Sequence, residues 1–497
     1  MSFFLNFPLF IIILSLMTAV TSSLLKEKAA RVLTLALAAV AAVLNLLTLA
    51  YTAAEGKSFT YLMGHYPHPW GNELKFGILE PLFAAAFAAV LFLSVLGGKK
   101  QLDQKLEHSK GRFYYVLCDL VLVSLTALVY TNDIFTGYVF IEICTLSSCG
   151  LLLIRQNGRT ILASVRYMMF SLIGSGLFLF GVIFLYSLTG HLLLPNLKES
   201  IAVLNASGER RLPLLAAVSL ITIGISVKSG LAPFHLWMAD TYGAALPSSS
   251  GILSGLVSKG YAFFLIKLVF DAFGPAFFYT SGVQNILFAF GVLGILLGSV
   301  GALRENNIFR MNAYSSAAQI GYIYMGIGLS ATMGIEAALF QILTHALTKP
   351  AIFLASAGLS DSAGGAKKFH NLQGTGFMNP FAGVSFSFEA FSMIGLPFTM
   401  GFISKYLFGM AAFDSTHNKM IPTLIALALS TILNTLYFAR TILRIYNTPK
   451  NGGTVRVPIR QQKNFFIAGS LFALANLFFG IFARPFIAFL ADGLRIF

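Results

Sequence analysis

The sequence predicts an all-α polytopic membrane protein with about fourteen transmembrane helices. Of the 497 residues, 57% are hydrophobic and only 11% are charged, whereas soluble domains carry about 25% charged residues. Apolar segments long enough to cross a bilayer recur along the whole chain. The expected spans lie near residues 7–24, 31–53, 77–97, 113–131, 134–154, 166–188, 213–233, 248–270, 282–302, 311–329, 334–358, 383–411, 422–445 and 466–490.

Membrane topology explains the net charge of +15 better than nucleic-acid binding does. Because cytoplasmic loops are enriched in Lys and Arg, the side with more of these residues is predicted to be cytoplasmic, and both termini are predicted to lie outside. The first span has no preceding basic stretch and no small-residue cleavage site, so it is expected to remain as a helix. The basic loops of the predicted cytoplasmic side lie near residues 26–31, 99–112, 155–159, 304–310, 367–368 and 450–463.

Two spans are predicted to be broken helices, the seventh at Gly230 and Pro233 and the twelfth at Gly395 and Pro397. A proline removes a backbone hydrogen bond from a helix, and interrupted spans at matching positions indicate a transporter built from repeats. Spans four to eight and nine to thirteen form two five-helix units, and an odd-numbered unit repeated in tandem must be inverted. The predicted divisions are an N-terminal three-helix segment (1–112), two inverted repeats (near 113–270 and 282–445) and a C-terminal loop with the last helix (446–497).

Ionisable residues lie inside several predicted spans, where a charged side chain costs about 2.5–3.5 kcal/mol on insertion scales. Burial disfavours a charged lysine and a nearby carboxylate favours it. A lysine held between these effects can gain and lose a proton, which an arginine cannot. We therefore interpret these residues as proton carriers, the alternative being static ion pairs. The main candidates are Glu142, Lys228, Lys259, His345, Lys349 and Lys405.

Three further residues are secondary candidates. His235 follows the break of the seventh span and is expected either to relay protons or to cap or hydrogen-bond the broken helix. Glu389 is expected to act as a relay or as the partner of a neighbouring helix, and Asp119 as a functional acid or an interfacial anchor. Lys267, near the end of the eighth span, is expected to extend to the membrane surface, and Pro350 is expected to kink the eleventh span.

The sequence indicates no cofactor and no metal. Cys118, Cys144 and Cys149 lie in apolar runs and form no CxxC pair, so neither a metal site nor a disulfide framework is predicted. No haem signature, GxGxxG or P-loop is present. The chain is therefore expected to contain no redox or hydrolytic centre of its own, and any enzymatic role would belong to a larger complex.

Five segments resemble a known family. They are NDIFTGYVFIEICTLSSCGLL (132–152), VKSGLAPFHLWMADTYGAALPSSSGILSGLVSKG (227–260), RMNAYSSAAQIGYI (310–323), LTHALTKPAIFL (343–354) and GLPFTMGFISKYL (395–407). The chain resembles the antiporter-like membrane subunits shared by respiratory complex I, Mrp-type multisubunit Na+/H+ antiporters and membrane-bound hydrogenases. The resemblance implies fourteen helices, a half-channel in each inverted repeat, and proton transfer through the six main candidates. It also implies a prokaryotic cell (inner) membrane and other membrane subunits, including related antiporter-like ones, as partners.

The branch of the family is predicted from smaller features. The loop YPHPWG (66–71) resembles a segment of the Mrp and hydrogenase branch, and no lateral-helix extension follows the last span. We therefore expect the D-type subunit of an Mrp-related module, alone or attached to a hydrogenase or to an NADH- or ferredoxin-linked oxidoreductase. A complex I quinone-oxidoreductase subunit and a non-conducting scaffold are the alternatives. The residues Asp240, Pro350 and Glu389 depart from the family pattern, and Na+ transport and the driving reaction stay open.

Overall fold

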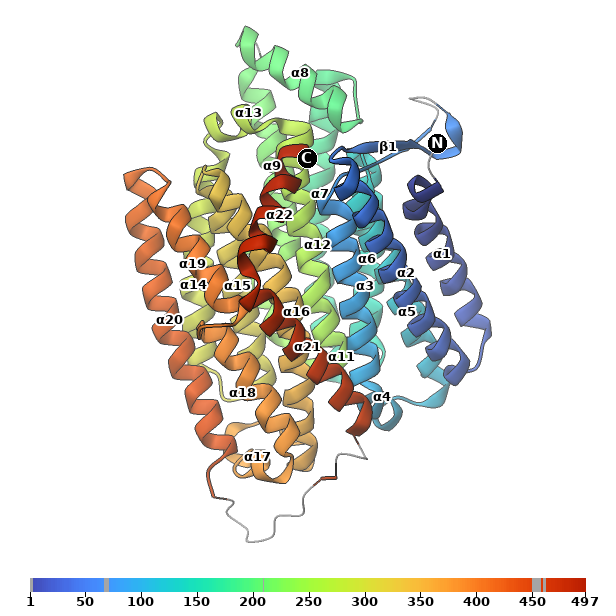
Figure 1. The fold of residues 1–497 in the computed structure, drawn as a ribbon, viewed down its shortest axis with the longest axis vertical. Helices are drawn as coiled ribbons and strands as arrows, with labels where there is room; N and C mark the ends of the chain where they lie inside the picture. The colour runs from blue at the N-terminus through green and yellow to red at the C-terminus, as the bar shows by residue number, and fades with distance from the viewer. Residues whose placement is uncertain (1–2, 67–70, 209, 449–456, 459–461) are drawn as a thin grey trace.

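A bundle of long helices forms most of the protein, as predicted. The computed structural model describes residues 3–66, 71–208, 210–448, 457–458 and 462–497. Within them, one small antiparallel sheet pairs β1 (Phe59–Leu62) with β2 (Glu73–Phe76), with Phe59 opposite Phe76. Figure 1 shows β1 at one end of the bundle, so the hairpin belongs to a loop between spans. The YPHPWG loop lies largely outside the described residues.

In the residues that the structure describes, twelve helices are long and apolar enough to cross a membrane. Two further elements fall outside that set, since α15 (Ile308–Gly328) carries many polar residues and α18 (Pro380–Ile394) with α19 (Met400–Phe413) is a broken span. Together these fourteen match the predicted spans in order. The twelve are α1 (Phe7–Leu24), α2 (Glu27–Glu55), α3 (Leu79–Gly97), α5 (His108–Tyr130), α6 (Ile134–Leu153), α7 (Gly158–Thr189), α9 (Arg211–Ser229), the composite helix Pro247–Phe273, α14 (Val283–Arg304), α16 (Thr332–Ser362), α20 (His417–Ile445) and α21 (Lys463–Ile481).

Short elements lie in the connections. Figure 1 shows α8 and α13 at the end of the bundle near β1, and α4 and α17 at the opposite end, while the two chain termini lie toward the α8 end. This arrangement agrees with the predicted alternation of the loops, and the assignment of one side to the cytoplasm stays a prediction. The short helices of the connections are η2 (Met63–His65), α4 (Lys99–Lys105), α8 (Leu194–Ser207), α10 (Leu236–Ala244), α13 (Pro275–Thr280), η5 (Phe369–Asn371) and α17 (Thr375–Met378). Outside the connections, η1 (Phe3–Asn6) precedes the first span, and Figure 1 shows α22 (Ala483–Ile496) running along the bundle beyond α21.

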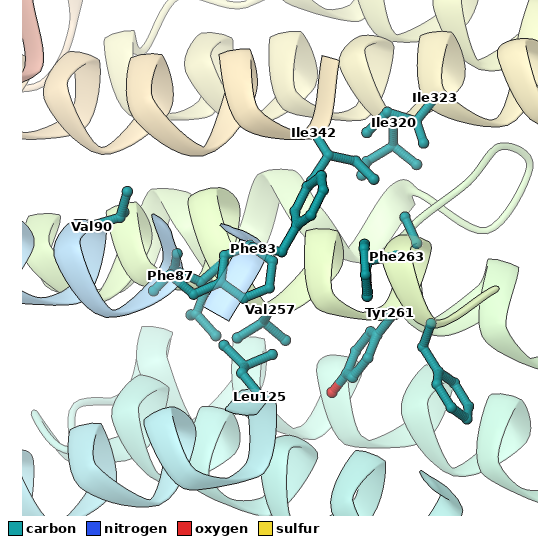
Figure 2. Close-up of a cluster of buried hydrophobic side chains, with 14 of the residues drawn as sticks. Phe83, Phe87, Val90, Leu125, Val257, Tyr261, Phe263, Ile320, Ile323 and Ile342 are labelled. Carbon is teal, nitrogen blue, oxygen red and sulfur yellow. The ribbon is translucent and has the colours of Figure 1, made fainter. Parts of the chain in front are cut away.

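The composite helix and α16 form the centre of the bundle. In the apolar 18-residue stretch of each helix, 100% of the residues of the composite helix and 94% of those of α16 are buried. The corresponding share is 33% for α2, α20 and α21. The composite helix consists of α11 (Pro247–Ile252), the π-helical segment η3 (Leu253–Val257), α12 (Ser258–Leu268) and the π-helical segment η4 (Val269–Phe273). Figure 2 shows side chains from α3, α5, α15 and α16 packed around it. Most residues in the central stretches of these two helices are therefore shielded from lipid.

Both predicted helix breaks are present. The helix α9 ends at Ser229 and α10 begins at Leu236, with Gly230 in the left-handed region at φ 80°. In the twelfth span, Gly395 has φ 96° between α18 and α19. Glycine takes this conformation without the steric penalty of a Cβ atom. The inverted repeat and the division into four segments remain predictions.

Pro350 lies within α16, which continues through it as one helix. Its ring packs against glycines of the composite helix: a Cβ atom at Gly255 would lie 2.6 Å from Pro350 Cγ, and one at Gly251 would lie 3.3 Å from Pro350 Cβ. The absence of side chains at these glycines therefore allows the two central helices to approach closely.

We expect Gly255→Ala to destabilise the protein by about 1–3 kcal/mol, the usual range for overpacking a close-packed interior. The added methyl group would meet Pro350 Cγ at 2.6 Å and the Ala346 carbonyl oxygen at 3.2 Å. The measurement is the thermal unfolding midpoint of the purified membrane complex. Gly176→Ala in α7 is the control, because nothing lies within 4 Å of its added Cβ. Equal midpoints for the two variants would contradict the packing argument.

Candidate functional site

Glu142 and Lys228 form an ion pair. Glu142 is on α6 and Lys228 is at the end of α9, just before the break, and Lys228 Nζ lies 2.9 Å from Glu142 Oε1. The lysine side chain is 1% exposed and the glutamate side chain is 25% exposed. The Ser175 hydroxyl on α7 also donates to Glu142. A buried lysine is therefore compensated by a carboxylate at the edge of the bundle.

A hydrogen-bonded path leads from this pair toward the central helices. Lys228 Nζ donates to Thr145 Oγ1 at 2.9 Å, and Thr145 lies 3.3 Å from the hydroxyl of Tyr261 on α12. Tyr261 is two residues after Lys259, although no direct hydrogen bond joins them among the described residues. Lys259 Nζ donates instead to the Ser254 carbonyl oxygen at 2.5 Å and to Ser258 Oγ at 3.0 Å.

Ser254 connects the composite helix to the second half of the protein. Its hydroxyl lies 2.8 Å from that of Ser316 on α15, and Ser316 donates to the Asn312 carbonyl oxygen. Lys349 Nζ donates to the same carbonyl at 3.1 Å and to Ser315 Oγ at 2.8 Å. The two central lysines are thus linked by hydroxyl and carbonyl groups alone.

His345 lies on α16 one turn before Lys349 and is fully buried. It interacts electrostatically with both Lys259 and Lys349. Neither ring nitrogen has a hydrogen-bond partner among the described residues. The neutral imidazole has one donor and one acceptor nitrogen, so the ring has both a donor and an acceptor without a partner in the described part of the chain.

A second path leads from Lys349 to the twelfth span. The hydroxyl of Tyr437 on α20 lies 2.9 Å from Ser315 Oγ and 2.8 Å from Asn434 Oδ1. The Asn434 amide donates to the Met393 carbonyl oxygen, and Lys405 Nζ donates to the next carbonyl, Ile394, at 2.7 Å. This path ends at the helix break, where the last carbonyls of α18 lack helical partners.

A small polar cavity adjoins Lys405. Its volume of about 10 Å³ is close to what one water molecule needs. The side chains of Gln319, Gln341 and Ser404 form a hydrogen-bonded chain along it. The cavity wall also includes Tyr322, Thr344, Ser392, Met393, Gly401 and Lys405. A second polar connection therefore exists between α16 and Lys405.

Comparison with known proteins gives the family. Residues 131–431 match the family described as NADH:quinone oxidoreductase/Mrp antiporter, TM. The chain belongs to this family. It is an antiporter-like subunit of the kind found in complex I-like and Mrp-like complexes, and a multi-pass membrane protein.

Individual relatives cover nearly the whole chain. NADH-quinone oxidoreductase subunit N of Desulforudis audaxviator is 28% identical over 91% of this chain and 89% of its own length. A chain of the membrane-bound sulfane sulfur reductase, an archaeal respiratory membrane complex, superposes with a TM-score of 0.86 at 25% identity, over 98% of this chain and 97% of that chain. A chain of the Mrp complex from Dietzia sp. DQ12-45-1b has the same fold, with a TM-score of 0.86 at 19% identity over 99% and 97%.

Glu389 lies near the row of ionisable and hydroxyl-bearing side chains that runs from Glu142 to Lys405. It is not in an ion pair among the described residues. It is buried on α18, and Asn476 of α21 donates to its Oε2 at 2.9 Å. The Asn476 side chain also accepts from Ser392 Oγ and from the Met400 backbone amide, across the break. Glu389 therefore has a partner on a neighbouring helix, as expected. That partner is the neutral amide of Asn476, a residue that the sequence did not mark as a candidate.

His235 and Asp119 do not join the row through any hydrogen bond among the described residues. The His235 side chain does not cap α10, but it donates a hydrogen bond to the Pro233 carbonyl oxygen at the break, which agrees with the expected hydrogen-bonding role. Its ring packs edge-on against Tyr314. Asp119 is fully buried on α5 and accepts from Ser22 Oγ of α1 at 3.1 Å. It is therefore not an interfacial anchor. Asp133 caps α6 by accepting from the Thr136 amide.

The prediction for Lys267 is wrong. Its side chain is fully buried, lies 3.3 Å from Glu80 of α3 and donates to the Val129 carbonyl oxygen. Nearby, Lys75 of β2 pairs with Asp271 of η4. The β-hairpin and α3 cover this end of the composite helix, so the lysine cannot reach water. The sequence does show Glu80 at the start of an apolar run, which indicates a buried carboxylate in need of a cation. Only the tertiary structure identifies Lys267 as that cation.

We expect Tyr437→Phe to lower proton transport several-fold, because it removes the only side-chain hydroxyl that connects Ser315 to Asn434 among the described residues. The cavity beside Gln341 would leave a residual path. The measurement is proton uptake by vesicles that contain the whole complex. Tyr406→Phe is the control, because Tyr406 is exposed on α19. Full activity of the Tyr437 variant would show that protons do not use this path.

Proposed function

We propose that this chain is a proton-translocating subunit of a multisubunit membrane complex. The observation that supports the proposal is the row of ionisable and hydroxyl-bearing side chains from Glu142 to Lys405 through the buried central helices. Such groups are costly in a membrane interior and mark ion pathways. A row that crosses both halves of the bundle has no evident structural need, because apolar residues would pack there at lower cost.

The Glu142–Lys228 pair acts as a switch in this proposal. With the pair closed, the carboxylate stabilises the charged lysine. When Glu142 takes up a proton or turns away, Lys228 loses its counter-ion and its proton moves on through Thr145 toward Lys259. His345 and Lys349 then pass the charge to Lys405. Lysine and histidine suit these positions because both exchange protons under conditions where arginine cannot.

The parent complex is proposed to be complex I-like. Several relatives share the name NADH-quinone oxidoreductase subunit N, which favours the complex I alternative over the expected Mrp D-type subunit. The partners would then be other membrane subunits, including related antiporter-like chains, in a prokaryotic cell membrane. H+ is the proposed transported ion because the lysine and histidine side chains of the row exchange protons, and transport assays with and without Na+ test coupling to Na+.

We expect Glu142→Gln to abolish proton transport while the complex still assembles, because the amide keeps the shape of the side chain but cannot hold Lys228 as a charge partner. The measurement is the pH change inside vesicles that contain the complex, with assembly followed on native gels. Glu199→Gln is the control, because Glu199 is an exposed carboxylate on α8. Wild-type transport by the Glu142 variant would refute the switch.

Lys405 is proposed to carry the proton at the far end of the row, where its Nζ contacts Ile394 O and Thr431 Oγ1. We expect Lys405→Ala to stop transport and Lys405→Arg to stop it as well, since arginine does not release its proton. Lys405→Glu should retain part of the activity, because burial disfavours a charged carboxylate and lets it hold a proton. The readout is proton uptake by the assembled complex. Normal pumping by the arginine variant would mean that Lys405 is only a fixed charge.

A further inference from the structure

A basic pocket lies away from the proton row, among the start of α7, α10, the start of α15 and the loop after α16. Its volume is about 800 Å³, within the usual range for small-molecule sites. By the alternation of the spans it belongs to the end of the bundle where Figure 1 shows α4 and α17. Five cationic side chains line it: Arg155, Arg159, Arg166, Arg310 and Lys367.

The cations outnumber the carboxylates of the pocket. The single acidic residue in its lining is Asp240, which pairs with both Arg166 and Arg310. Arg310 also pairs with Glu305 outside the lining. The other three cations, Arg155, Arg159 and Lys367, have no carboxylate partner among the described residues. The pocket therefore has an uncompensated positive charge that an anion would neutralise.

Lys367 lies deepest among these cations. Its Nζ donates to the Gly243 carbonyl oxygen at 2.8 Å and lies 4.9 Å from the centre of the Phe309 ring. Burial, together with repulsion from Arg155, Lys105 and Arg159, lowers the pKa of Lys367 to about 8. These cations are therefore close enough to Lys367 for their repulsion to disfavour its charged form. Two helix N-termini add to this potential, because the capping residues Asn157 of α7 and Asn307 of α15 both line the pocket.

An apolar surface continues from the pocket along α7. Leu162 lines the pocket and is 54% exposed. Beyond it, the same long helix exposes a series of apolar side chains along the membrane-spanning length. A free anion would make no use of this surface, whereas the acyl chains of a lipid would cover it. The exposed apolar residues of this series are Ile161, Leu162, Val165, Met169, Leu172 and Ile173.

We propose that this pocket binds the phosphate headgroup of an anionic phospholipid whose acyl chains lie along α7. Basic pockets between transmembrane helices on the cytoplasmic side suit such headgroups. The phosphate would lie among Arg155, Arg159 and Lys367, and Asp240 would hold Arg166 and Arg310 in place. The lipid would join the first half of the protein at α7 to the second half at α15.

The test uses the whole complex, purified from its membrane and depleted of lipid. Thermal unfolding midpoints are measured with added phosphatidylcholine, phosphatidylglycerol or inorganic phosphate. We expect phosphatidylglycerol to raise the midpoint in a saturable manner and the other two additives to raise it less. Equal effects of the two lipids would overturn the proposal, and equal protection by inorganic phosphate would replace the lipid with a free anion.

Two variants locate the effect. Arg159→Gln removes an exposed cation with no partner among the described residues, and we expect half-saturation to need about fivefold more phosphatidylglycerol. Lys367→Gln should act in the same direction. Lys368→Gln is the control, because Lys368 is an exposed neighbour of equal charge outside the pocket lining. An equal response from Arg159→Gln and Lys368→Gln would overturn the site, as would crosslinks showing that a partner subunit fills the pocket.

Discussion

The need to stabilise lysines inside a membrane bundle is the constraint on which the rest of the structure depends. Of the four lysines of the row, only Lys228 has a carboxylate partner within the described part of the chain. The other three rely on hydroxyl groups and backbone carbonyls, and two of these carbonyls come from irregular helix segments. Lys259 binds the Ser254 carbonyl in the π-helical segment, and Lys405 binds that of Ile394 at the break. Irregular backbone inside a membrane is tolerated where it is buried in protein, and here it supplies acceptors for charge.

Apart from the Glu142–Lys228 pair, whose carboxylate is 25% exposed, the degree of compensation separates the lysines of the row from the buried charges at the β-hairpin end. At the β-hairpin end, Glu80 pairs with Lys267 and Lys75 pairs with Asp271, so both lysines have a carboxylate nearby. Removing one partner of such a pair would leave a buried charge, which disfavours any movement of a proton. In the row, Lys259 and Lys349 donate hydrogen bonds to neutral hydroxyl and carbonyl groups, and neither has a carboxylate partner among the described residues. The same residue types therefore serve a fixed structural role in one place and a proposed carrier role in the other.

The central helices must also approach closely for the row to connect. The glycines of the composite helix at 251 and 255 accommodate Pro350 of α16 directly after Lys349. This contact brings the helix that carries Lys259 beside the helix that carries Lys349. Asn476 of the last spanning helix holds the two sides of the second break together through Ser392 and the Met400 amide. Residues without charge thus determine where the charged ones lie.

The sequence by itself determined the spans, the two breaks and the six main ionisable candidates. These features are local, because a bilayer imposes a length on each apolar run and a charge inside such a run is visible without a fold. Only the tertiary structure decided the partners. It brought Glu142 to Lys228, buried Lys267 against Glu80, separated Asp119 and His235 from the row, and inserted Tyr437 and Asn434 into it. Neutral polar side chains are common in membrane helices, so their hydrogen bonds depend on which helix faces are packed together, and a single sequence does not specify that packing.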